Sequence, residues 1–414
     1  MTSPRTHEPV RLDSSGGRRM YEQTDRLREA GPAVRVALPE GVVAWSVTRG
    51  DVIKRLLTHP GVTRDARKSV PGYRPGTVQW LFPWVDVESM FNAEGQDHTR
   101  LRKLVGPAFA PRRIAAMRPR VQAIVARQLD TLAARAGEEP VDLRAGFSYG
   151  VPTEVICDLF GVPGGRRAEM MEVFGRVADT GATPEEAAAV SRELISVVRA
   201  LVELKRREPG DDMTSLLLAA REEDEDRLSE QELLSTLFLM IGAGSQTAIS
   251  LIDNAIRELL SHREQLKAVL AGEIPWSEVI EETLRLHSSV MHMPMRWATE
   301  DIDLGEGIVI RTGESMLIGF GAPGRDPGVH TDPGSFDAGR EDKAHLAFGH
   351  GVHYCLGAPL GRLEADVALP ALFERFPGIE LAVDPGRIRP QRSFIGNDVV
   401  DLPVRLRPRD RTAD

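Results

Sequence analysis

The stretch that decides the fold is FGHGVHYCLG, residues 348–357, in which one cysteine lies between glycine-rich turns. An apolar run with helical spacing follows it at Leu360, Leu363 and Val367. Cys355 therefore lies just before a predicted helix N-terminus, where unpaired backbone N–H groups and the positive end of the helix dipole favour a thiolate. The glycines let the backbone approach a flat partner closely. The pattern indicates either a nucleophile or a metal ligand.

Three interpretations of Cys355 compete. It is a buried structural cysteine, a zinc ligand together with His345, His350 and His353, or an axial thiolate to haem iron. A structural cysteine would explain neither the glycines nor the histidines, and structural zinc prefers more thiolates at fixed spacings. The decapeptide resembles Phe-x-x-Gly-x-[His/Arg]-x-Cys-x-Gly, the haem-binding loop of the cytochrome P450 family. The resemblance implies a haem b (protoporphyrin IX iron) with Cys355 as its metal ligand.

Composition and length suit one large domain. The chain has 414 residues, 42% of them hydrophobic, and shows no internal repeat or low-complexity linker. We expect residues 1–18 to form a disordered tail and residues 19–414 to form a single domain. Only two cysteines, Cys157 and Cys355, argue against a disulfide framework and for a reducing compartment.

Charge and hydropathy exclude several partners. The net charge of −9 disfavours nucleic acid. No segment reaches the ~18 apolar residues of a membrane span, and the N-terminus lacks the apolar core of a signal peptide. We therefore expect a cytoplasmic monomer without a membrane anchor, similar to the soluble bacterial (actinobacterial-type) P450 class.

Helical periodicity dominates the chain, so the predicted fold class is mainly α with small β sheets. Strand-like runs occur at residues 33–38 and 42–47, and Gly-rich hairpins at about 302–320. The longest helix is predicted to begin after a capping box, Ser229 to Glu232, and to reach Leu260. The resemblance implies a cytochrome P450 fold, with this long central helix over the haem and the Cys-ligand loop beneath it.

The long helix contains IGAGSQTA, residues 241–248, with two glycines that each cost about 1 kcal/mol relative to alanine. Close helix packing or a kink would explain them, and so would a local opening of the helix that leaves room for oxygen. By resemblance, Ala243 and Gly244 contact the cofactor and Thr247 is the catalytic hydroxyl. Gln246 stands where the family usually has a carboxylate. Because an amide does not titrate, we expect altered proton delivery through Gln246 and Thr247.

Glu282 and Arg285 match the Glu-x-x-Arg signature of the family and share one helix face. The resemblance implies a structural role, locking the core that holds the cysteine loop. The family's usual third partner is replaced by Ser335, and Arg340 is a candidate for that role.

Haem propionates need cations and hydrogen-bond donors. The residues that resemble the family's propionate partners are His98, Arg102, Arg296 and His353. The loop residues implied to lie against the cofactor are Phe348, Gly349 and Gly357.

The long loop at 64–96 is aromatic, which favours a lid over an apolar ligand, although core packing explains it equally well. By resemblance to the family, the substrate pocket draws on the long helix, on the segment after the Glu-x-x-Arg helix and on the last hairpin. Ordinary apolar core is the alternative for most of these residues. The predicted pocket residues are Trp84, Phe238, Ile241, Val290, His292, Met293 and Phe394.

These resemblances imply a P450 monooxygenase that activates O2 to hydroxylate or oxidatively couple a small to medium apolar natural product, a steroid or a polyketide- or peptide-type substrate. Electrons would come from NAD(P)H through a ferredoxin and a ferredoxin reductase, since no nucleotide-binding fingerprint follows a strand. The ferredoxin would dock beside the cysteine, on Arg102, Arg112, Arg113 and Arg362. The alternatives are a haem-thiolate peroxygenase or coupling enzyme, suggested by Gln246, and a non-catalytic haem sensor.

Overall fold

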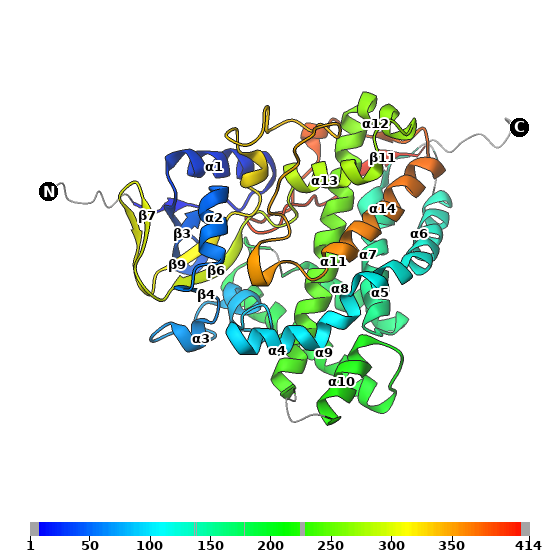
Figure 1. The fold of residues 1–414 in the computed structure, drawn as a ribbon. Helices are drawn as coiled ribbons and strands as arrows, with labels where there is room; N and C mark the ends of the chain where they lie inside the picture. Colours follow the sequence, from blue (N-terminus) through cyan, green and yellow to red (C-terminus); the bar gives the residue numbers. More distant parts are fainter. Residues whose placement is uncertain (1–7, 136, 138, 178, 224–227, 407–414) are drawn as a thin grey trace, which may run out of the picture.

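The long helix α11 (Glu230–Ser261) crosses the middle of the molecule, as Figure 1 shows. At its start the Ser229 hydroxyl accepts a hydrogen bond from Glu232 N, and the Glu232 carboxylate accepts one from Ser229 N. The predicted capping box is therefore confirmed. Within the described residues α11 alone is long and apolar enough to cross a membrane, but 61% of its most apolar window is buried inside the protein. It is the core helix of this fold.

The computed structural model describes residues 8–406, except 136, 138, 178 and 224–227. Besides α11, its helices are α1 (Gly17–Ala30), α2 (Gly50–Leu57), α3 (Ala66–Ser69), α4 (Gly95–Val105), α5 (Pro111–Ala116), α6 (Arg118–Ala133), α7 (Gly150–Leu159), α8 (Gly164–Gly175), α9 (Pro184–Arg207), α10 (Met213–Glu223), α12 (Arg263–Leu270), α13 (Trp276–Leu286) and α14 (Ala358–Arg375). The predicted mainly helical architecture is confirmed.

The strands of the described residues form three small sheets; in Figure 1 the large sheet lies on the left of α11 and β11 lies on its right. The strands are β1 (Val10–Arg11), β2 (Val34–Ala37), β3 (Val43–Val47), β4 (Val62–Thr63), β5 (Val141–Asp142), β6 (Met293–Ala298), β7 (Ile302–Gly305), β8 (Ile308–Ile310), β9 (Ser315–Ile318), β10 (Glu380–Leu381) and β11 (Pro403–Arg405). The largest sheet has the order β1-β2-β3-β9-β6-β4, the second is β10-β11-β5, and β7 pairs with β8.

The N-terminal segment differs from the predicted disordered tail. Val10 pairs with Val36 and Arg11 with Ala37 in a parallel register, so β1 adds an edge strand to the large sheet. The helix α1 also begins at Gly17, inside the range predicted to be disordered. Residues 1–7 lie outside the described residues.

The cysteine loop is held between two core helices. It ends where α14 begins, and α14 packs against both α11 and α13. The inward face of α14 carries Leu360, Leu363 and Val367, the three residues whose spacing predicted a helix, and all three are buried. The same apolar core therefore fixes the cysteine loop relative to α11.

Candidate active site

A cavity of about 340 Å³ lies between α11 and the cysteine loop. Thr247 from α11 and Cys355 from the loop both line it, so the structure brings together the two residues that sequence reasoning placed on opposite faces of a cofactor. The loop turns sharply because Gly349 and Gly351 take φ values of 76° and 73°, which favour glycine. Cys355 N then donates to Phe348 O over 2.8 Å, which closes the turn.

The Cys355 side chain is open to the cavity and otherwise surrounded by protein. Burial raises the pKa of its thiol, and the N–H of Gly357 and the charge of Arg102 oppose this rise only in part. The expected thiolate preference therefore does not come from the helix N-terminus alone. A cationic metal at this position would supply the missing stabilisation.

The zinc interpretation is wrong for the described part of the chain, where no group of three or more His, Cys, Asp and Glu side chains is arranged to hold a metal ion. His345 is turned away, with Nε2 3.1 Å from Glu281 Oε2. His353 instead stacks on His98, with ring centroids 4.4 Å apart. A single thiolate facing a large cavity suits an axial ligand to a metal that a cofactor brings with it.

One end of the cavity is rich in hydrogen-bond donors, and one of them, Arg102, already donates through Nη2 to Tyr354 O over 2.7 Å. Arg102, Arg296 and His353 line the cavity there, and His98 supports His353 from behind without lining it. Nε2 of His98 and Nε2 of His353 are buried and make no hydrogen bond. The nearest acceptor to His353 Nε2 is Glu94 Oε2 at 3.5 Å, which is too far for a good bond. These donors fit the carboxylates of a bound ligand.

Arg64 belongs to the same cluster, although sequence reasoning did not include it. Arg64 is 2% exposed and lines the cavity, and its guanidinium lies 3.4 Å from the centroid of the Phe91 ring. Nη2 donates to Pro294 O at 3.1 Å, whereas Nε has no partner. No spacing rule marks this arginine, because only the tertiary fold brings β4 beside β6.

The charges of this cluster fit haem. Arg64, Arg102 and Arg296 bring three positive charges, and Glu94 brings one negative charge, which leaves room for two carboxylates. Burial lowers the pKa of Arg296 to about 10, and burial together with Arg296 holds the pKa of Arg64 well below its usual range. Two propionates would relieve both effects. Bound haem would supply the iron at which O2 is activated, with Cys355 as its protein ligand.

The opposite wall of the cavity is formed by α11. The Thr247 hydroxyl donates to Ala243 O over 2.7 Å, and Thr247 O accepts from the Ser289 hydroxyl over 2.8 Å. Gln246, Ala243 and Gly244 also line the cavity. The Gln246 amide nitrogen is buried and makes no hydrogen bond to the described residues, so it is available to orient a water or a ligand.

The two glycines of α11 are explained by close helix packing and not by an opening of the helix. The helix is continuous from Glu230 to Ser261. A Cβ on Gly242 would lie 2.9 Å from the Phe174 ring, and a Cβ on Gly244 would lie 2.5 Å from Ile156 Cδ1. Both glycines therefore permit close packing of α11 against α8 and α7.

Four of the predicted pocket residues, Trp84, Phe238, Val290 and Met293, line the cavity. They are joined there by three apolar residues that sequence reasoning did not place in the pocket, Phe91, Phe174 and Val177. The cavity lining is consequently aromatic, and two of its rings, Phe174 and Phe238, stack with centroids 5.6 Å apart.

For Ile241, His292 and Phe394 the pocket prediction is wrong. Ile241 is fully buried in the apolar core. Nδ1 of His292 lies 2.8 Å from Phe394 O, Nε2 lies 3.3 Å from the Thr24 hydroxyl, and burial lowers the pKa of His292 to about 4. Phe394 packs edge-on against Trp80, with centroids 5.7 Å apart. These three residues are close to pocket residues in the sequence, but their side chains do not line the cavity.

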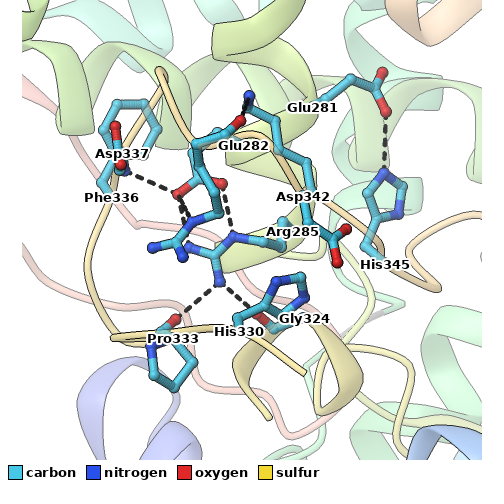
Figure 2. Close-up of polar contacts among 12 residues, drawn as sticks. Glu281, Glu282, Arg285, Gly324, His330, Pro333, Phe336, Asp337, Asp342 and His345 are labelled. Carbon is cyan, nitrogen blue, oxygen red and sulfur yellow. Dashed lines mark hydrogen bonds and ion pairs between the residues drawn. The ribbon is translucent and has the colours of Figure 1, made fainter. Parts of the chain in front are cut away.

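Glu282 and Arg285 form a fully buried, bidentate ion pair (Figure 2), with Nε–Oε2 2.6 Å and Nη2–Oε1 2.7 Å. Arg285 also donates to the carbonyls of Gly324, Pro333 and Ser335. The remaining contacts to Glu282 Oε1 come from Asp337 N at 2.8 Å and from Nε of Arg340, the proposed third partner, at 3.4 Å. The pair ties α13 to the segment that leads into the cysteine loop.

A second buried acid lies on α14. Glu364 is inaccessible to solvent, and neither of its carboxyl oxygens has a hydrogen-bond partner in the described part of the chain. Burial raises the pKa of Glu364 to about 8. At neutral pH this carboxyl is therefore predominantly protonated.

The fold and this cysteine-centred cavity define an oxidoreductase of the haem-thiolate monooxygenase class. The chain belongs to the cytochrome P450 family, whose model matches residues 276–394. It is 45% identical, over 97% of its length and 98% of the relative's, to 2-hydroxy-5-methyl-1-naphthoate 7-hydroxylase of Streptomyces carzinostaticus. It is 36% identical, over 93% of its length and 96% of the relative's, to 6-deoxyerythronolide B hydroxylase of Saccharopolyspora erythraea.

A solved structure, CYP154A1 from Streptomyces coelicolor A3(2), superposes with a TM-score of 0.91. That chain is 45% identical, and the match covers 96% of this chain and all of the other. The predicted family, fold class and enzyme class are therefore confirmed.

Proposed function

We propose that the protein hydroxylates a fused-ring aromatic natural product. The observation that carries this proposal is the aromatic wall of the cavity, formed by Trp84, Phe91, Phe174 and Phe238. Flat aromatic rings gain about 0.5–1.5 kcal/mol per stacked or edge-on partner beyond their buried area. The 45% identical relative is named for hydroxylation of a naphthoate, a compound with two fused aromatic rings.

The residues have distinct roles in this reaction. The aromatic wall orients the ring system and excludes water. The Gln246 amide orients water beside the reacting atoms, and the Thr247 hydroxyl exchanges protons with that water. Cys355 would hold haem b by its iron, and the arginine and histidine cluster would bind its propionates. One O2 and two electrons are consumed for each hydroxyl group formed.

The electrons come from NAD(P)H through a ferredoxin reductase and a ferredoxin. The cysteine loop exposes two apolar residues, Val352 and Tyr354, and α5, which contacts α14, exposes Arg112 and Arg113. An acidic ferredoxin suits this combination. Arg362 contributes less than expected from the sequence, because Glu281 pairs with it through two bonds of 2.6 and 3.0 Å. A cytoplasmic, monomeric, single-domain enzyme is consistent with such soluble electron carriers.

Absorption spectroscopy tests the assignment of the ligand and the substrate class together. The reduced carbon monoxide complex should show the red-shifted band of thiolate ligation, and Cys355→Ala should abolish it. Among a panel of ferric-state ligands, hydroxynaphthoates should displace water from the iron, whereas linear fatty acids of equal carbon number should not. A preference for the linear acids would refute the fused-ring proposal without affecting the thiolate assignment.

A second candidate is a peroxide-using or coupling enzyme, which Gln246 favours because it lacks a titrating group at this position. Turnover with hydrogen peroxide, and none with ferredoxin, reductase and NADPH, would select this candidate. Gln246→Glu should then raise the product formed per reductant consumed in the ferredoxin-driven reaction.

A further inference from the structure

Three charged side chains from distant parts of the sequence meet beside α11. Arg144 lies in the turn Arg144–Ser148 after β5, Asp253 lies on α11, and Asp398 lies in the segment before β11. Nη1 of Arg144 is 2.5 Å from Asp253 Oδ2 and 2.7 Å from Asp398 Oδ2. The two carboxylate oxygens therefore converge on a single nitrogen.

The charges in this cluster do not balance. The side chains of Asp253 and Asp398 are 0% and 5% exposed, so two buried carboxylates share one guanidinium. Two like charges this close cannot both ionise at little cost, and one proton remains on the pair. Burial raises the pKa of Asp398 to about 8 and also raises the pKa of Asp253.

The other titratable groups that face the cluster leave this conclusion unchanged. Asp142 on β5 adds negative charge toward Asp253, although its Oδ1 already accepts from the backbone N–H groups of Arg144 and Leu402. Tyr149, at the end of the same turn, has a pKa that burial raises, so it stays neutral. Asp142 therefore favours retention of the proton, and neutral Tyr149 adds no charge that would oppose it.

The cluster connects the surface to the cavity. The Arg144 side chain is 12% exposed, whereas Asp398 lines the cavity. From Asp398 a run of polar groups leads toward Thr247. Ser250 donates to Asn397 O over 2.6 Å, Asn397 N donates to Ser289 O over 3.0 Å, and the Ser289 hydroxyl donates to Thr247 O. These side chains form a polar strip in an otherwise apolar cavity wall.

We propose that Arg144, Asp253 and Asp398 hold one proton and pass it through cavity water to the Thr247 end of the site. This inference rests on the proposed hydroxylation, which converts RH and O2 with two electrons and two protons to ROH and H2O. The electrons come from the ferredoxin. Each proton leaves the Asp253–Asp398 pair, and solvent at the Arg144 edge replaces it. The cluster thereby takes the part that a carboxylate at position 246 would play.

The experiment compares Asp398→Asn with Asp401→Asn in the complete enzyme with ferredoxin, reductase and NADPH. Asp401 lies in the same segment but pairs with Arg389 at the surface, 2.6 Å away, so it is the matched control. Asp398→Asn should lower the product formed per NADPH at least fivefold, with more hydrogen peroxide, a larger solvent isotope effect and unchanged substrate affinity. Asp401→Asn should match the wild type. Unchanged coupling in Asp398→Asn would overturn the proposal.

Two further measurements keep the proposal testable if Asp398→Asn folds poorly. Asp398→Glu retains a titrating group and should retain coupling, whereas Asp253→Asn should lose it, and the reverse result would overturn the proposal. The wild-type-minus-Asp398→Asn infrared difference spectrum should show a protonated carboxyl band at pH 6 that is absent above pH 9. Absence of that band also refutes the proposal, even if the wild type shows no turnover and the proposed hydroxylation itself fails.

Discussion

Glu364→Gln should make the protein more stable at neutral pH. Unfolding returns Glu364 to an ordinary pKa of 4.5, whereas burial raises its pKa in the folded protein to about 8. Between these values the folded protein holds a proton that the unfolded chain releases, so stability falls as the pH rises from 4.5 to 8. Glutamine keeps the shape of the protonated glutamate side chain but does not titrate, so it removes this dependence of stability on pH.

The magnitude follows from the pKa difference. Keeping the carboxyl protonated at pH 7 costs about 1.4 kcal/mol for each pH unit above 4.5, which is roughly 3 kcal/mol. For a chain of 414 residues with an unfolding entropy of about 2.1 cal/mol/K per residue, this corresponds to about 3–4 °C in melting temperature. The advantage of the variant should vanish near pH 4.5 and be largest above pH 8.

Circular dichroism melting curves of the haem-loaded wild type and variant, recorded from pH 5 to 8.5, measure this difference. Glu374→Gln is the matched control, because Glu374 is an exposed acid on the same helix, and it should leave the pH slope unchanged. A Glu364→Gln variant that is destabilised equally at all pH values would refute the reasoning. It would mean that the folded protein holds Glu364 as a charged, partnered carboxylate.

Three other perturbations test the site. Arg285→Lys leaves Glu282 without its bidentate partner and should cost about 3–5 kcal/mol in chemical unfolding, whereas Arg340→Lys, a change at the 3.4 Å contact, should cost under about 1 kcal/mol. Gly244→Ala should lower stability by about 1–3 kcal/mol through its clash with Ile156 Cδ1 and Cγ1, and Ile156→Ala, which removes both atoms, should restore part of that loss; activity loss without destabilisation would contradict the packing account. Arg64→Met should weaken haem retention about tenfold or more in transfer to apomyoglobin, and an unchanged rate would contradict its propionate role.

The parts of the site that follow from local sequence were predictable. The cysteine loop needs glycines at fixed positions, and the start of α11 needs Ser229 and Glu232 three residues apart. Both requirements can therefore be recognised in the sequence. The cavity residues Arg102, Arg296 and His353 and the Glu282–Arg285 pair were predicted because a family pattern marks them. The same sources correctly gave the mainly helical fold.

The errors and omissions concern directions in three dimensions. Sequence shows that Gly244 lies in a helix but does not show which helix its missing side chain would meet. It places His292 beside a pocket residue but does not show that the ring turns toward Thr24. Arg64 and Asp398 are recognised as site residues only through charged partners far along the chain, so no local spacing could reveal them.

The buried Arg285 side chain has a consequence for local opening of the protein. Its guanidinium donates to the carbonyls of Gly324, Pro333 and Ser335, all of which lie in the segment between β9 and the cysteine loop. Peeling this segment from α13 would leave a charged group in the interior without acceptors, which costs several kcal/mol. Amide protons of α13 and of residues 324–337 should therefore exchange with deuterated water as one cooperative unit, slowly and together. The scaffold beneath the cofactor would then yield only when much of the core opens with it.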